Sequence, residues 1–273
     1  MGKLVWLASY PKSGNTWVRA FLHNYIVNAE TPHSINNLVD FSVAECAAAF
    51  FGTPGEVLEP QAVQAKRPEV HEALTRLHDD LVFVKTHNAN LSVHGADLCT
   101  PGATAGAIYI VRDPRDVALS YAAFTGKSVD EMIDFMGQEG AANASDGVQV
   151  FELLSSWSRH ALSWVAAPRR LLVRYEDLIA DPMRGFGRVI RFLGERDAAA
   201  EPERLARAIN FSSFTTLAGQ EDREGYQASG AKGGKFFRAG KAGGWREHLT
   251  PEQAARLWQA HGPVMEKFGY QQN

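Results

Sequence analysis

The chain has 273 residues, 45% of them hydrophobic and 22% charged, which is the composition of an ordinary globular protein with ample length for a buried core. Its formal net charge is −3, so the chain lacks the overall positive charge that is typical of nucleic-acid-binding proteins. No apolar run approaches the roughly 20 residues of a membrane span, and the chain starts on a short strand-like run, so we expect a cytoplasmic protein with neither membrane nor nucleic-acid partners.

The first predicted element is a buried strand over Leu4–Ala8, which Tyr10-Pro11 ends because proline cannot donate a ladder hydrogen bond. From Trp17 onward, apolar residues recur every three or four positions, which predicts a helix. The turn between them is Lys12-Ser13-Gly14-Asn15-Thr16, whose backbone N–H groups and lysine charge predict a phosphate site at a helix N-terminus. It is not a standard Walker A loop, because no glycine precedes Lys12 at the required spacing.

Continuous apolar runs predict three more strands, over Leu81–Val84, Ala107–Val111 and Leu171–Val173. Periodicity predicts helices over residues 41–51, 60–79, 150–164, 183–193 and 201–209, and a further helix that starts at residue 117. Strands that are apolar on both faces and separated by helices indicate a single α/β domain over residues 1–273, with a central parallel sheet and helices on both faces. In such sheets ligands bind beyond the carboxyl ends of the strands, where the polar clusters of this chain lie.

Two strands run directly into polar residues. The second predicted strand ends in Lys85-Thr86-His87, and histidine suits a general base near neutral pH. The third runs into Arg112 and Asp113 before a helix that carries Ser120, and the arginine fork suits a phosphate. Considered alone, Asp113 could instead hold magnesium as the Walker B aspartate of a kinase or NTPase, and Arg112 could form a surface ion pair.

The octet Tyr-Pro-Lys-Ser-Gly-Asn-Thr-Trp at residues 10–17 resembles the 5′-phosphosulfate loop of the cytosolic-type sulfotransferases, in which Thr usually stands at the place of Asn15. Motif segments in the same order continue the resemblance to Trp245. The resemblance implies a P-loop-NTPase-like sheet, 3′-phosphoadenosine 5′-phosphosulfate (PAPS) as donor, adenosine 3′,5′-bisphosphate (PAP) as product, and no metal. The cofactor-binding residues that it implies in this loop are Lys12, Ser13, Gly14, Asn15, Thr16 and Trp17, with Trp17 stacked on the adenine.

The resemblance also assigns the rest of the cofactor site. Arg112 and Ser120 hold the 3′-phosphate, and Asp113 is then only a helix N-cap. Ala239 and Gly244 depart from the family pattern, which has Lys and Asp there, so Lys241 or Lys235 is expected to replace the missing cation. The other implied contacts, to the adenine and the second 3′-phosphate segment, are Tyr175, Ser212, Ser213, Phe214, Phe236, Phe237, Arg238 and Gly240.

The implied reaction moves a sulfuryl group in line from a phosphate oxygen to an acceptor oxygen or nitrogen. The leaving phosphate gains charge and the acceptor loses a proton, so the reaction needs cations and a base. The resemblance implies that His87 is the general base and that Lys12 and Lys85 stabilise the transferring group. The acceptor is expected to be a hydroxylated or amino small molecule. An apolar or aromatic acceptor is suggested by a set of residues that could equally belong to the core: Phe41, Phe50, Phe51, Tyr121, Phe124 and Met136.

Residues 219–244 are rich in glycine and charge, which is typical of a surface loop or of a lid over a charged ligand, and we expect the lid. The family's dimer motif is degraded between Arg246 and Ala255, so both a monomer and a homodimer remain open. Cys46 and Cys99 predict reduced core thiols rather than a disulfide or metal site. Two other functions remain: a P-loop kinase or NTPase using Mg-ATP, against which the missing Walker glycine argues, and a non-catalytic nucleotide-binding protein, against which Lys85 and His87 argue.

Overall fold

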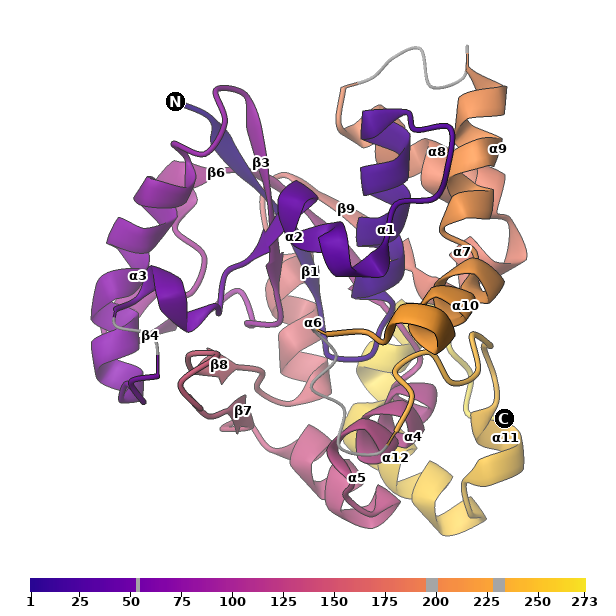
Figure 1. Cartoon of the computed structure of the whole chain (residues 1–273). Helices are drawn as coiled ribbons and strands as arrows, with labels where there is room; N and C mark the ends of the chain where they lie inside the picture. Colours follow the sequence, from indigo (N-terminus) through magenta and orange to yellow (C-terminus); the bar gives the residue numbers. More distant parts are fainter. Residues whose placement is uncertain (53–54, 195–200, 228–233) are drawn as a thin grey trace.

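A parallel sheet of five strands, in the order β2-β3-β1-β6-β9, forms the centre of the computed structural model, which describes residues 1–52, 55–194, 201–227 and 234–273 (Figure 1). Its strands are β1 (Lys3–Ser9), β2 (Ser42–Ala44), β3 (Leu81–Thr86), β6 (Thr104–Val111) and β9 (Arg170–Arg174). Two small antiparallel pairs accompany it: β4 (Ser92–Val93) with β5 (Ala96–Asp97), and β7 (Ala142–Asn143) with β8 (Glu152–Leu153).

Helices cover both faces of the sheet (Figure 1). Because side chains alternate along a strand, Leu4 and Trp6 of β1 pack into one apolar layer while Val5 and Leu7 pack into the other. The first layer is completed by α3 (Pro60–Leu74), α4 (Pro114–Thr125), α5 (Val129–Gly137), α6 (Trp157–Val165) and α12 (Pro251–Lys267). The second is completed by α1 (Asn15–Val27), α7 (Tyr175–Ala180), α8 (Pro182–Phe192) and α9 (Pro202–Phe211). The predicted α/β domain with helices on both faces is therefore confirmed.

The remaining helices are α2 (Leu38–Phe41), α10 (Phe214–Glu224) and α11 (Trp245–His248), and 3₁₀ turns occur at Ile35–Asn37, Ala48–Phe50 and Pro101–Ala103. The register aligns Ala8 of β1 with Thr86 of β3 and with Tyr109 of β6. The residues that follow these strands therefore leave the sheet at one edge. Among the described residues, no helix is long and apolar enough to cross a membrane.

Two predicted helices are wrong in part. Residues 41–51 contain the edge strand β2, because Ser42, Val43 and Ala44 pair with β3, and the remainder forms a 3₁₀ turn. Residues 150–164 become helical only from Trp157, since Ser155 adopts a left-handed φ of 61° and the preceding residues form β8. The predicted breaker at residues 52–55 includes 53–54, and the predicted lid at 219–244 includes 228–233, which lie outside the described residues.

Candidate active site

The turn between β1 and α1 has a backbone that glycine and asparagine fix. Lys12 has a φ of 64° and Gly14 a φ of 103°, both left-handed. A Cβ atom on Gly14 would lie 2.7 Å from the Tyr175 ring, so this position has no room for a side chain. The Asn15 amide donates to the Leu7 carbonyl at 2.8 Å and to the Ser9 hydroxyl at 3.3 Å. The Asn15 side chain therefore fastens the start of α1 to β1.

Several buried polar atoms around this turn have no hydrogen-bond partner in the described parts of the chain. They are Ser13 Oγ, Asn15 Oδ1, Trp17 Nε1 and Arg112 Nε. Gly14, the N-cap of α1, offers no side-chain cap to the free N–H groups of the first helical turn. Buried polar atoms cost free energy unless they are paired, so the three donors among them, on Ser13, Trp17 and Arg112, fit an anionic, polar ligand such as a phosphate.

The Lys12 ammonium lies between two aromatic rings. Its Nζ atom is 3.5 Å from the centroid of Phe236 and 4.5 Å from that of Phe124. Burial, together with the positive charges of Arg112 and Arg238, lowers the pKa of Lys12 to about 7, against the opposing charge of Glu221. An anion bound here would favour the protonated form of Lys12.

Arg112 connects three parts of the site. Its guanidinium donates to the Lys12 carbonyl at 3.1 Å and to the Lys241 carbonyl at 2.9 Å, and its central carbon lies 4.4 Å from the Tyr175 ring centroid. Ser120 lies half-buried on α4, which begins directly after the Arg112 strand exit. The two residues predicted to bind a 3′-phosphate are thus carried by one junction, β6 to α4.

The residues predicted for the adenine and the second phosphate segment form two contacts. The Trp17 ring contacts the Tyr175 ring edge-on at 5.6 Å. A Cβ atom on Gly240 would lie 2.3 Å from the Phe214 ring, so the second phosphate segment packs directly on the start of α10. The Ser213 hydroxyl caps α10. Ser212 differs, because its fully buried hydroxyl donates to the Ala208 carbonyl at 2.8 Å, inside α9, and is turned away from the site.

His87 has one defined tautomer. Its Nδ1 atom lies 2.8 Å from the Ser9 carbonyl oxygen, which can only accept, so Nδ1 carries the proton and Nε2 carries the lone pair. Burial lowers the pKa of His87 to about 3, and the nearby Lys85 charge adds to the effect. His87 is therefore a neutral imidazole near pH 7, and no described residue hydrogen-bonds to its Nε2 atom.

The carboxylate of Glu152 lies beside the predicted base and cation. It accepts a hydrogen bond from the His87 backbone N–H at 3.0 Å and lies 4.0 Å from Lys85 Nζ. Burial lowers the pKa of Lys85, but Cys46 and Glu152 outweigh it and the pKa is raised. Burial raises the pKa of Glu152, yet the charges of Lys85 and His87 and the hydrogen bonds hold it at about 2. The sequence pattern predicts a helix at Glu152, and no local motif marks this residue as part of a site.

Most of the residues proposed for the acceptor pocket do not lie at the candidate site. Phe51, Tyr121 and Met136 are buried in the core. Phe41 stacks on Phe83, and Phe50 is partly exposed. Of this set, Phe124 is the one in contact with a predicted site residue, Lys12.

The two cations proposed to replace the lysine missing at Ala239 are used differently. Lys235 Nζ pairs with the Asp222 carboxylate at 2.5 Å on the surface. The Lys241 carbonyl accepts a hydrogen bond from Arg112.

The Asp113 carboxylate, proposed as a magnesium ligand in the kinase alternative, accepts from the Arg115 guanidinium at 2.8 Å and caps α4. The described part of the chain contains no group of three or more His, Cys, Asp or Glu side chains that could hold a metal ion.

Comparisons with known proteins identify the family of the chain. A sulfotransferase domain model matches residues 3–269. Cytosolic sulfotransferase 16 of Arabidopsis thaliana is 26% identical over 96% of this chain and 75% of its own length. Flavonol 3-sulfotransferase of Flaveria bidentis is 24% identical over 93% of this chain and 78% of its own length.

Solved structures show the same fold. Retinol dehydratase in complex with androsterone and the inactive cofactor PAP superposes with a TM-score of 0.62 at 20% identity, covering 96% of this chain and 80% of that one. Mouse sulfotransferase SULT7A1 complexed with PAP gives a TM-score of 0.59 at 19% identity, covering 98% of this chain and 86% of that one.

Proposed function

Because the chain belongs to the sulfotransferase family, whose domain model spans residues 3–269, we propose that it transfers a sulfuryl group from PAPS to a hydroxyl or amino group of a small molecule. The observation that carries this proposal is the neutral His87 side chain near the Lys85 ammonium. Its Nδ1 atom donates to Ser9, so the lone pair on Nε2 is available to accept a proton. A base and a cation at the carboxyl edge of a parallel sheet suit proton removal and stabilisation of a transferring anion.

The 5′-phosphosulfate is proposed to bind at the turn between β1 and α1. Ser13 supplies an unpaired hydroxyl, and Lys12 supplies a charge. The backbone N–H groups of Gly14, Asn15 and Thr16 lie at the N-terminus of α1, where a helix favours anions. The unpaired polar atoms of this turn support the proposal.

The adenosine 3′-phosphate is proposed to bind between the β6–α4 junction and the segment around residue 240. Arg112 and Ser120 come from the junction, and Arg238 and Gly240 from the segment. To receive the phosphate, Arg112 exchanges its bonds to backbone carbonyls for stronger bonds to a charged acceptor. Lys241 is the proposed replacement for the lysine missing at Ala239, because Lys235 is already paired with Asp222.

The adenine is proposed to lie against the aromatic residues Trp17, Tyr175 and Phe214, with Ser213 and the Phe236–Phe237 pair beside them. Aromatic rings are tolerant platforms for a base, and the indole Nε1 of Trp17 is a buried donor with no described partner. Ser212 keeps its hydroxyl inside α9 and would contribute backbone only.

During transfer, the bond from sulfur to the 5′-phosphate oxygen breaks as the bond from sulfur to the acceptor oxygen or nitrogen forms. His87 Nε2 takes the acceptor proton, and the electron pair of the broken bond stays on the phosphate. Lys12 and Lys85 stabilise the negative charge on the transferring and leaving groups. Glu152 holds the His87 backbone and keeps Lys85 charged.

Two observations support a proposal for the acceptor class: the aromatic residues around Lys12 and the molecules bound in similar solved structures. Phe124 and Phe236 give the site an apolar wall next to the reacting group. Two structural neighbours are complexes with retinol and with androsterone, which are apolar alcohols. An apolar hydroxylated small molecule is therefore the proposed acceptor.

Residues 219–244 are proposed to act as a lid over the cofactor. The Glu221 carboxylate accepts from the backbone N–H groups of Phe236 and Phe237, at 2.6 Å and 2.9 Å, and so holds Phe236 over Lys12. These contacts cover the 5′ turn with an aromatic ring, which would exclude water from the transferring group.

Calorimetric titration tests this function against its alternatives. We expect PAP to bind more tightly than ADP, and EDTA to leave the affinity unchanged. Binding that requires Mg-ATP would overturn the proposal and make the chain a kinase or NTPase. Tight PAP binding without consumption of PAPS by any acceptor would instead favour a non-catalytic nucleotide-binding protein.

A further inference from the structure

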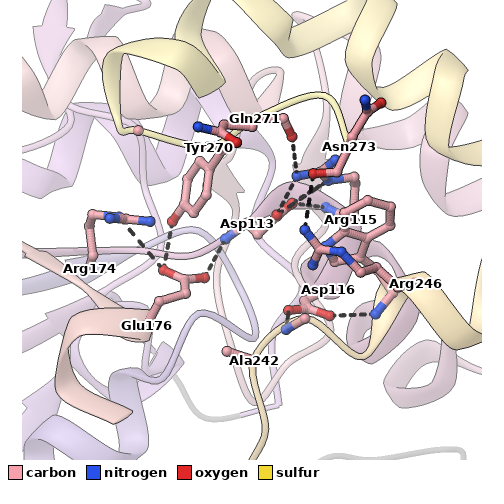
Figure 2. Close-up of a pocket in the computed structure, with 13 residues that line it drawn as sticks. Asp113, Arg115, Asp116, Arg174, Glu176, Ala242, Arg246, Tyr270, Gln271 and Asn273 are labelled. Carbon is pink, nitrogen blue, oxygen red and sulfur yellow. Dashed lines mark hydrogen bonds and ion pairs between the residues drawn. The ribbon is translucent and has the colours of Figure 1, made fainter. Parts of the chain in front are cut away.

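A cavity of about 360 Å³ lies behind the proposed 3′-phosphate segment, between the exits of β6 and β9 and the last residues of the chain (Figure 2). Asp113, Arg115 and Asp116 line it from the β6–α4 junction. Glu176 lines it from the start of α7, and its carboxylate accepts from the Tyr270 hydroxyl at 2.9 Å. The charged groups that Figure 2 shows here bond to protein atoms, so the cavity wall is a scaffold for the neighbouring segment.

Asp116 is the member of this wall that contacts the segment most directly. It is only 4% exposed, although it carries a carboxylate. One carboxylate oxygen accepts from the Gly243 N–H at 2.7 Å, and the other accepts from the Trp245 N–H at 2.9 Å. Both oxygens are thus engaged with main-chain donors, and each such charged bond is stronger than a neutral one.

Two neighbours of Asp116 also contact residues 241–245. The Arg115 guanidinium lies 3.6 Å from the Trp245 ring centroid, and Arg112 donates to the Lys241 carbonyl at 2.9 Å. Three residues within the five-residue stretch 112–116 therefore hold residues 241–245 by separate contacts. Of these contacts, the two made by Asp116 fix the path of the backbone itself.

We infer that Asp116 is a positioning residue for the 3′-phosphate: it fixes the segment that carries Arg238 and Gly240 against the junction that carries Arg112 and Ser120. This inference rests on the proposed function. Asp116 and Ser120 are four residues apart on α4 and so share one face of the helix. Gly240 lies three residues before Gly243, the first residue that Asp116 binds. Groups from the two elements can meet on one phosphate only while this connection holds.

The inference predicts a loss that depends on the 3′-phosphate alone. Calorimetry compares PAP with adenosine 5′-monophosphate (AMP), which lacks only that phosphate, on wild-type protein and on Asp116→Ala. We expect the variant to lose about tenfold or more in PAP affinity, the scale of one charged hydrogen bond, with less than about a twofold change for AMP. Asp116→Asn keeps one acceptor oxygen and should show a smaller loss of the same kind, so it replaces the alanine variant if that variant does not fold.

Asp181→Ala is the matched control, because Asp181 also accepts from a backbone N–H, that of Arg184 at 3.0 Å, but caps α8 away from this segment. Its ratio of AMP to PAP dissociation constants should equal that of wild type. Equal losses of both ligands in Asp116→Ala would show a general structural role and overturn the inference, and so would unchanged affinities. Wild-type protein that binds AMP as tightly as PAP would overturn the proposed function first, and this inference with it.

Discussion

The Nδ1 atom of His87 lies 2.8 Å from the carbonyl oxygen of Ser9, across the pair of strands β3 and β1. Ser9 is the last residue of β1, and the turn that carries Lys12 follows it directly. The proposed base is therefore oriented by the same strand that delivers the proposed phosphate turn. The bond also decides the tautomer, because only a protonated Nδ1 can donate to a carbonyl.

Replacing His87 with Asn should remove the base and keep the bond to Ser9, because the Asn amide can donate in place of Nδ1. General bases contribute about 10²–10⁴-fold, so we expect kcat to fall by about that factor while the PAP dissociation constant changes by less than about twofold. Steady-state kinetics together with calorimetry measure both. Turnover at the wild-type rate would show that His87 is not the base.

The affinity for PAP should decrease as the pH rises above about 7, because burial lowers the pKa of Lys12 to about 7 in the free protein. A bound anion favours the ammonium, so the ligand must take up a proton with Lys12 wherever the free lysine is neutral. Calorimetry between about pH 7 and pH 9 should give this slope in the wild type. Lys12→Met should weaken binding and flatten the slope; a slope that survives in Lys12→Met would assign it to another group.

Gly14→Ala should unfold at a lower temperature than wild type. The new Cβ would lie 2.7 Å from the Tyr175 ring, at a φ of 103° that residues with side chains avoid. Such backbone strain costs about 1–3 kcal/mol. Gly140→Ala is the control, since a Cβ there meets nothing within 4 Å and Gly140 has no positive φ. Equal melting temperatures for the two variants would contradict this packing.

Glu152→Gln should destabilise the fold at neutral pH and lower kcat. Breaking a buried ion pair costs about 3–5 kcal/mol, and Lys85 would lose one of the groups that, with Cys46, raise its pKa. The Glu152 pKa is lowered from 4.5 to about 2, so its stabilisation is present above pH 4.5 and is lost as the pH falls toward 2. Urea unfolding should therefore show the gap between wild type and variant narrowing in acid. A gap that stays constant with pH would contradict the lowered pKa.

Four of the five central strands could be predicted from the sequence, because each is a continuous apolar run that leads into polar residues at one edge. β2 could not, since three residues, Ser42 to Ala44, carry no periodicity and become a strand only by pairing with β3. Glu152 was missed for a similar reason. Its partners, His87 and Lys85, are more than sixty residues away in sequence, and only the fold brings them together.

The local motifs at Lys12, Lys85, His87 and Arg112 indicated which residues gather at the carboxyl edge, because a strand followed by a turn fixes where the next side chains lie. They did not indicate what holds those side chains. The bond from Asn15 to Leu7, the packing of Phe236 on Lys12 and the inward turn of Ser212 depend on tertiary contacts.

Transfer of labelled sulfate from [³⁵S]PAPS tests the central claim most directly. Wild type and His87→Asn are incubated with phenols, apolar alcohols and amines, with and without EDTA, and labelled product and PAP are measured together. We predict one PAP for each labelled product in the wild type, no effect of EDTA, and loss of both products in His87→Asn. Intact PAPS with every acceptor, and hydrolysis of Mg-ATP in a parallel incubation, would contradict the account.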